Sequence, residues 1–296
     1  MYILPRNEAL DVNPPQGNEE LTTHGSDWLW AVFGLYMLFF FIFFATSFFA
    51  KSGEKIFHYL FTIALLVGSL TYFAVASDLG WEVVTVADSK PSYAHGGVWT
   101  RQVFWVEYVN WVVSFPVIVI SLGLLSGISW ASIVFNVFLS WTWVITLLVS
   151  ALTGTRYKWG FFAIGCLAWF ILAFNTLFYG LAGAKRVGVS RDYIILAGYL
   201  NFFWLIYPIA WGIADGGNKI GVTPGYIFYG ILDLCVVPVL AFAFYFLSSK
   251  WDYTKLNIAF TRYGRVPQSG EFPEKTTPAP AAAAPPVVGE PTTAAA

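Results

Sequence analysis

Residues 108–155 read YVNWVVSFPVIVISLGLLSGISWASIVFNVFLSWTWVITLLVSALTGT, and none of these 48 side chains carries a charge. A helix that crosses a membrane needs about 20 apolar residues, so this stretch is long enough for two of them. Ser126-Gly127 interrupts the stretch and provides a break between two helices. The stretch therefore predicts two consecutive membrane-spanning helices.

The rest of the chain segregates its charges in the same way. Only 11% of the 296 residues are charged and 57% are hydrophobic, whereas a soluble domain has about 25% charged residues. Five further segments contain no Lys, Arg, Asp or Glu apart from Asp233: Trp28–Ala50, Ile56–Ser77, Trp159–Ala184, Tyr193–Ala214 and Ile220–Ser249. The sequence therefore predicts an all-α membrane protein, with seven helices in one bundle at residues 27–250.

Three longer regions lie outside the predicted spans: residues 1–26, the loop at 79–100 and residues 251–296. Residues 1–26 are polar and lack the apolar core of a cleavable signal peptide, so they are expected to form an extracellular segment. The loop at 79–100 holds the β-prone stretch Glu82-Val-Val-Thr-Val-Ala before the turn residues Asp88-Ser-Lys-Pro91, which predicts a small extracellular hairpin. Residues 251–296 are expected to form a cytoplasmic tail, disordered from about residue 267 because large apolar side chains become scarce there.

Lys and Arg residues between the spans predict the orientation. With the N-terminus outside, the inner loops and tail hold ten of these residues and the outer regions hold six, Arg101 among them. Basic residues collect on the cytoplasmic side of membrane proteins. The bias therefore predicts a multi-pass protein with its N-terminus outside and its C-terminus in the cytoplasm.

The sixth apolar segment carries aromatic residues on one helical face. Trp204, Tyr207 and Trp211 recur at spacings of three and four, and Pro208 is expected to kink the helix beside them. Taken alone, this pattern indicates aromatic packing at a proline kink.

Two other segments connect this face to a known family. Residues 107–121 read EYVNWVVSFPVIVIS, which resembles the third helix of microbial rhodopsins, Arg-Tyr-x-Asp-Trp-x-x-Thr-x-Pro followed by an acid. Residues 225–238 read GYIFYGILDLCVVP, which is similar to the Asp-x-x-x-Lys of the family's last helix. The resemblance covers about residues 27–255 and implies a seven-helix bundle of that type. It also implies a pocket frame made of Tyr108, Trp111, Pro116, Trp204, Tyr207, Pro208, Trp211 and Asp233.

The departures from the family concern the groups that do its light-driven chemistry. The resemblance places Val237 at the retinal lysine, Asn110 at the proton-accepting Asp, Ser121 at the inner acid and Glu107 at the Arg. All lysines of the chain lie in loops, at predicted helix ends or in the tail. We therefore expect no covalent retinal and no enzymatic activity, although a noncovalent retinoid or sterol-like ligand stays open.

Two acids remain among these positions. Asp233 and Glu107 would add two negative charges to the bundle, and one charge near the bilayer centre costs roughly 2.5–3.5 kcal/mol on insertion scales. We predict that Asp233, and in the stronger form also Glu107, is protonated or shares a proton with a neighbour such as Tyr207 or Asn110. The alternative is that Asp233 is a structural hydrogen-bonding residue and Glu107 reaches water on the outer side.

An opsin bundle without its lysine resembles the fungal opsin-related proteins, including plasma-membrane proteins of the thirty-kilodalton heat-shock type. That resemblance implies stress-induced expression, residence in the plasma membrane, and chaperone-like action or regulation of the plasma-membrane proton pump. The competing hypothesis is a light-independent proton or cation pathway through Glu107 and Asp233. His24, His58 and His95 lie too far apart in sequence and topology for a shared metal site, and we find no nucleic-acid-binding pattern. The oligomeric state stays open.

Overall fold

The computed structural model describes residues 7–51, 53–87, 99–253, 255–256 and 258. Within these residues, seven helices are long and apolar enough to cross a membrane, which confirms the predicted count. The helices that form these spans are α2 (Thr23–Phe49), α3 (Lys55–Ala76), α4 (Trp105–Ser126), α5 (Trp130–Leu152), α6 with η2 and α7 (Lys158–Val187), α8 with η3 (Ser190–Gly216) and α9 (Val222–Ser248). The predicted disordered tail lies outside the described residues.

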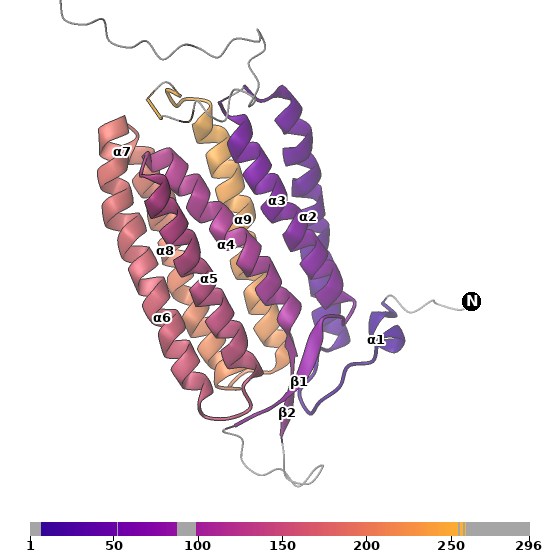
Figure 1. Ribbon diagram of the computed structural model, residues 1–296. Helices are drawn as coiled ribbons and strands as arrows, with labels where there is room; N and C mark the ends of the chain where they lie inside the picture. Colours follow the sequence, from indigo (N-terminus) through magenta and orange to yellow (C-terminus); the bar gives the residue numbers. More distant parts are fainter. Residues whose placement is uncertain (1–6, 52, 88–98, 254, 257, 259–296) are drawn as a thin grey trace, which may run out of the picture. The chain divides into compact units, whose positions relative to one another are not determined.

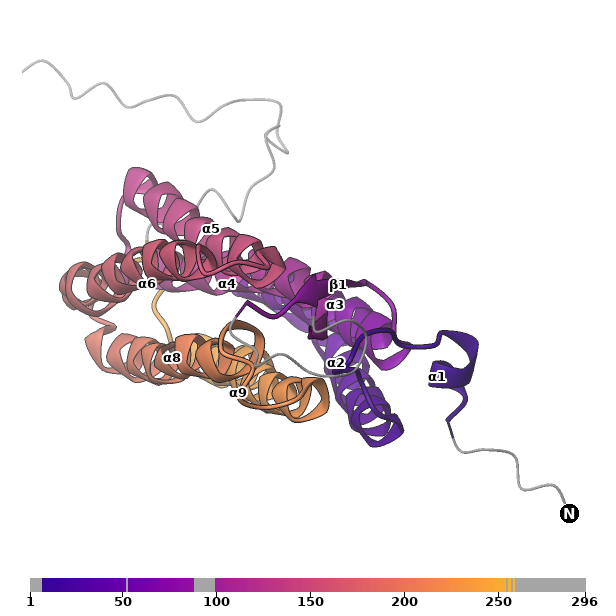
Figure 2. The ribbon, with the colours of Figure 1, turned by 90° about the horizontal axis from the view of Figure 1, so that it is seen from below.

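The seven spans form a closed ring of neighbours. Each one packs against the next in sequence order, and α9 returns to pack against α2 and α3 (Figures 1 and 2). Short connections between apolar helices favour such antiparallel neighbours. The ring places residues from α3, α4, α8 and α9 around a common interior.

Local sequence explains where the helices begin and end. The first span starts at Thr23, slightly before the predicted residue 27, because the Thr22 side chain caps it by accepting from the backbone nitrogen of Gly25. The predicted break at Ser126-Gly127 is confirmed. Gly127 ends α4 with φ at 65°, a left-handed conformation that glycine adopts without a steric penalty.

Two spans contain π-helical segments. The η2 segment (Asn175–Gly180) joins α6 to α7 (Leu181–Val187), and η3 (Gly212–Gly216) extends α8. The Tyr193 hydroxyl donates to the carbonyl oxygen of Thr176 at 2.7 Å, and Gly180 gives the tyrosine ring room to approach. Such segments shift the register of a helix and often occur at functional positions.

The predicted hairpin is present between α3 and α4. Strand β1 (Trp81–Thr85) pairs antiparallel with β2 (Thr100–Phe104), with Trp81 opposite Phe104 (Figure 1). The predicted turn at Asp88-Ser-Lys-Pro91 lies outside the described residues.

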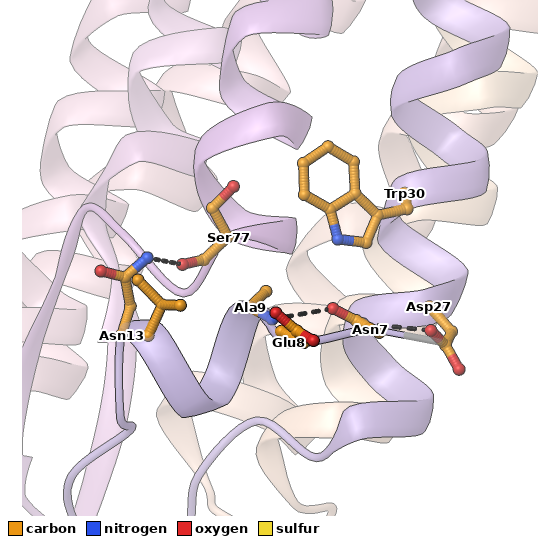
Figure 3. Close-up of a pocket in the computed structure, with 8 residues that line it drawn as sticks. Asn7, Glu8, Ala9, Asn13, Asp27, Trp30 and Ser77 are labelled. Atoms are coloured by element: carbon orange, nitrogen blue, oxygen red, sulfur yellow. Dashed lines mark hydrogen bonds between the residues drawn. The ribbon is translucent and has the colours of Figure 1, made fainter. Parts of the chain in front are cut away.

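The N-terminal segment folds onto this end of the bundle. It carries the short helix α1 (Ala9–Val12). Asn7 donates to the side chains of Ser26 and Asp27, and Asn13 donates to the carbonyl oxygen of Ser77. These contacts lie around an open pocket of about 560 Å³ beside Trp30 (Figure 3). The polar segment is therefore held against α2 and α3 by specific hydrogen bonds.

A buried acid links the hairpin to α3. Asp78 follows the helix with φ at 55°, is 2% exposed, and accepts a 2.6 Å hydrogen bond from the side chain of Gln102. The Gln102 side chain in turn accepts from the backbone nitrogen of Leu21. Burial raises the pKa of Asp78 from its ordinary value of 3.8 to about 6.

This raised pKa predicts a pH-dependent stability. The folded chain holds the Asp78 proton more tightly than the unfolded chain, so the free energy of unfolding falls as pH rises from about 4 to about 6. Asp78→Asn should therefore stabilise the protein above pH 6 and give no gain below pH 4. Thermal unfolding in detergent at both pH values measures this difference. Glu82→Gln, which removes an exposed carboxylate from β1, is the control, and an equal gain from Asp78→Asn at both pH values would contradict the prediction.

Candidate functional site

Asp233 lies at the centre of the bundle and is 1% exposed. Its carboxylate accepts hydrogen bonds from the Tyr207 hydroxyl at 2.5 Å and from the Tyr72 hydroxyl at 2.8 Å. The Asn110 amide donates to it at 2.9 Å and the Trp111 indole at 3.0 Å. These donors come from α3, α4 and α8, so the carboxylate joins three helices to α9.

Glu107 forms a second acid beside Asp233. Its side chain is completely buried, and one of its oxygens lies 3.2 Å from the Tyr72 hydroxyl that also donates to Asp233. The two carboxyl groups thus converge on the same hydroxyl. A hydroxyl carries one hydrogen and can donate to only one carboxylate at a time. The two acids and Tyr72 are therefore one hydrogen-bonded unit.

This geometry bears on both interpretations of the acids. Tyr207 and Asn110, the predicted proton-sharing neighbours, do contact Asp233. The second oxygen of Glu107 has no hydrogen-bond partner within the described chain, so a proton on it would displace no existing hydrogen bond. Shared protonation stays a prediction. The idea that Glu107 reaches outer water is wrong for this structure, because the side chain has no exposed surface.

An aromatic cage lies next to these acids, on the side away from the hairpin. Phe115 is 1% exposed, and its ring centroid lies 5.2 Å from those of Trp143 and Trp204 and 5.3 Å from that of Tyr207. Trp111 stacks on its other side at 6.1 Å. At these centroid distances the rings contact each other directly, so there is no space for a ligand between them.

Two further frame residues, Pro116 and Pro208, and two of the substituted positions, Val237 and Ser121, lie in α4, α8 and α9. Pro116 and Pro208 are buried inside α4 and α8. Val237 is 1% exposed and follows Asp233 by one turn of α9. Ser121 is also buried, and its hydroxyl donates to the carbonyl oxygen of Val117 in its own helix. Ser121 therefore has its hydrogen bond satisfied locally.

Trp211 belongs to a different polar centre from Asp233. Its indole donates to the Tyr108 hydroxyl at 2.9 Å, and Tyr108 donates to Asp215 at 2.8 Å. Asp215 lies in η3 and is 4% exposed. The predicted frame therefore divides into one group around Asp233 and a second around Asp215.

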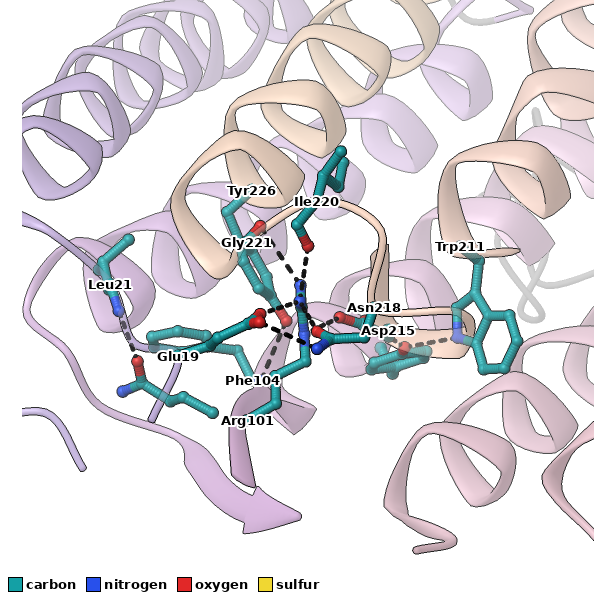
Figure 4. Close-up of polar contacts among 12 residues, drawn as sticks. Glu19, Leu21, Arg101, Phe104, Trp211, Asp215, Asn218, Ile220, Gly221 and Tyr226 are labelled. Carbon is teal, nitrogen blue, oxygen red and sulfur yellow. Dashed lines mark hydrogen bonds and ion pairs between the residues drawn. The ribbon is translucent and has the colours of Figure 1, made fainter. Parts of the chain in front are cut away.

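Arg101 of β2 supplies the cation of this second centre and is 2% exposed (Figure 4). Its guanidinium lies 3.1 Å from the Glu19 carboxylate and 3.4 Å from that of Asp215. It also donates to the Asn218 side chain at 2.7 Å and to the carbonyl oxygen of Ile220 at 2.8 Å. One arginine therefore connects the N-terminal segment, the hairpin and the α8–α9 connection.

This centre was not predicted from the sequence. Arg101 counted there only as a basic residue of the outer regions, and the family's arginine position is occupied by Glu107. Asp215 could have been found, because it follows Trp211 by four residues and shares its helical face. Tyr72 and Trp143 had no such signal, since single aromatic residues in apolar spans do not indicate their partners.

The comparisons with known proteins agree with this architecture. The family described as bacteriorhodopsin-like protein matches residues 23–251. The chain belongs to this family. This structure is similar to the crystal structure of the light-driven proton pump LR (Mac) from Leptosphaeria maculans. The two superimpose with a TM-score of 0.72, and their sequences are 30% identical. The match covers 78% of this chain and 98% of the pump.

Two fungal proteins are similar to this chain over most of its length. Protein FDD123 of Trametes versicolor is 39% identical over 276 residues, which cover 93% of this chain and 92% of the relative. The 30 kDa heat shock protein of Saccharomyces cerevisiae is 32% identical over 292 residues, which cover 90% and 82%. The chain is an opsin-like membrane protein related to fungal heat-shock and opsin-related proteins.

The Arg101 centre predicts a large effect on stability. Arg101→Gln leaves Asp215 and Glu19 without their cation, and breaking a buried ion pair costs about 3–5 kcal/mol. Lys219→Gln removes an exposed cation at the same end and should change stability by no more than about 0.5 kcal/mol. Chemical unfolding in detergent compares the two variants. Equal, small effects would show that the Arg101 centre does not hold this end together.

Proposed function

We propose that this protein uses the opsin bundle without covalent retinal, as a stress-related or regulatory plasma-membrane protein. The observation that carries the proposal is the buried valine at position 237, which resemblance assigns to the retinal lysine. A Schiff base needs a primary amine at that position. Among the described residues, lysines lie in loops or near helix ends, as Lys55, Lys158 and Lys185 do, so they cannot substitute.

The surroundings of Asp233 support the same proposal. In retinal-binding members of the family, the protonated Schiff base is the cation that balances the nearby acids. Here the donors to Asp233 are two hydroxyls, an amide and an indole, all of which are neutral. Phe115 fills the space beside the rings of Trp143 and Trp204. The interior is therefore suited to structural stability rather than to a charged chromophore.

The regulatory role rests on the relatives and on the surface. One relative is a 30 kDa heat shock protein, which supports stress-related expression of this chain. The proposed orientation places the N-terminus outside, the basic ends of the helices in the cytoplasm, and apolar side chains such as Phe48 toward lipid or another membrane protein. We propose that this surface makes chaperone-like contacts with membrane proteins or regulates the plasma-membrane proton pump, and that it acts by binding rather than by catalysis. Deleting the gene and measuring stress survival and pump activity tests this role.

Addition of retinal tests the main claim. We expect purified protein incubated with all-trans retinal and then reduced with borohydride to carry no covalent adduct by mass spectrometry. Val237→Lys combined with Phe115→Ala should form one, because it provides an amine and opens the cage. Phe115→Ala alone is the control without an amine.

A covalent adduct on the unmodified chain would overturn the proposal. A shifted visible band that vanishes on acid denaturation, with no adduct, would instead favour a noncovalent retinoid ligand.

The buried acid unit favours a light-independent proton or cation pathway as the second candidate. Glu107, Tyr72 and Asp233 connect within hydrogen-bonding distance toward the hairpin end. Beyond Asp233, however, Ser121 donates within its own helix and Phe115 blocks the interior with aromatic contacts. The outer half of such a pathway thus contains acids that can hold a proton, whereas Ser121 and Phe115 in the inner half provide no titratable group.

Liposome flux separates the two candidates. We expect proton flux through the reconstituted protein, followed with an internal pH-sensitive dye, to equal that of Asp233→Asn, because the inner half lacks a relay. Asp27→Asn, which changes an acid at the membrane edge, is the matched control. Flux that disappears only in Asp233→Asn would favour the second candidate.

A further inference from the structure

A second cavity lies at the end of the bundle opposite the hairpin. It has a volume of about 470 Å³ and is formed between the start of α5 and the η2–α7 segment. Its polar lining is Ser129, Ser132, Asn136, Asn175, Tyr179 and Arg186, with no carboxylate among the described lining residues. The volume is in the range of about 300–1,000 Å³ typical of small-ligand sites.

Asn136 carries an unpartnered donor into this cavity. The residue is 4% exposed, and its side-chain oxygen accepts from the Asn175 amide at 2.9 Å. That bond fixes the orientation of the Asn136 amide and leaves its NH₂ group without a partner among the described residues. The NH₂ group of Asn136 can therefore donate to an acceptor that enters the cavity.

The other groups around the cavity favour an anionic acceptor. Arg186 lies in the last turn of α7, exposed and without a carboxylate partner in the described chain. The N-terminus of α5, capped by Ser129, adds partial positive charge, and the Ser132 and Tyr179 hydroxyls can donate. A guanidinium combined with a helix N-terminus is suited to bind phosphate.

The cavity opens at the lipid-facing side of the bundle. Phe135 lines it and is 49% exposed, and Phe138, one turn farther along α5, is 58% exposed. Tyr179 is 64% exposed, and tyrosine is enriched where membrane spans meet the headgroup layer. The π-helical η2 segment supplies both Asn175 and Tyr179 to this wall. A polar pocket therefore continues into an apolar helix surface.

We propose that this cavity binds the headgroup of a phosphate-bearing membrane lipid. The phosphate lies near Arg186, the start of α5 and the Asn136 amide, and an acyl chain follows Phe135 and Phe138. A free phosphate shares the headgroup chemistry but does not use the apolar surface. The site is independent of the acids around Asp233 and of the stress-related function.

Native mass spectrometry of the full chain in detergent tests the site with three probes. They are dioctanoyl phosphatidylserine, dioctanoylglycerol and inorganic phosphate. We expect one phosphatidylserine to be retained, and neither of the other two. Arg186→Gln should lower the affinity roughly fivefold, the equivalent of about 1 kcal/mol for one basic group at an anionic membrane surface.

Two more variants keep the test specific. Asn136→Asp can still accept from Asn175 but replaces the NH₂ donor by a carboxylate oxygen, so it should abolish retention. Arg191→Gln removes an exposed arginine that does not line the cavity and should leave retention unchanged. Equal loss in Arg186→Gln and Arg191→Gln, or equal retention of dioctanoylglycerol, would overturn the proposal. Binding of inorganic phosphate as tight as that of the lipid would also overturn it.

Discussion

A carboxylate in the middle of a membrane bundle has to be matched by hydrogen-bond donors, and Asp233 imposes this requirement on the whole interior. Tyr207 from α8, Tyr72 from α3, and Asn110 with Trp111 from α4 all converge on it. Any shift of one of these helices would leave its buried donor without the acceptor that Asp233 provides. The register of four spans is therefore set by one acid, and the aromatic cage around Phe115 packs against the same side chains.

The buried acids lie in two centres, and the groups that stabilise their carboxylates differ between the two. Around Asp233 every donor is neutral, and Glu107 shares the Tyr72 hydroxyl with it. Around Asp215, seven residues beyond Pro208, the balance comes from the Arg101 guanidinium and includes Glu19. The Arg101 cation thus lies at the hairpin end, where it ties down the N-terminal segment, and no Lys or Arg side chain among the described residues donates to Asp233. That division suits a stable scaffold, as the proposed function requires.

The residues of the predicted frame are buried in the bundle, but the contacts among them could not be predicted. Spacing placed Trp204, Tyr207 and Trp211 on one face, and these residues do line the interior. It did not reveal that Trp211 reaches Tyr108 and Asp215 whereas Tyr207 reaches Asp233. Tyr72 completes the Asp233 centre and Trp143 completes the cage around Phe115, each from another helix. Local spacing carries no information about such contacts between spans far apart in sequence.

The amino-acid sequence by itself determined the seven spans, the hairpin arm at β1, the break at Gly127 and the valine at position 237. Each of these depends on local chemistry: runs of apolar residues long enough to cross a bilayer, β-branched side chains, a glycine at a left-handed position, or the absence of an amine. Only the tertiary structure decided that Arg101 is buried against Asp215, that Glu107 faces Asp233, and that Phe115 closes the cage. These outcomes depend on how the helices rotate against one another, which is set by packing and by pairing of buried polar groups across the whole bundle.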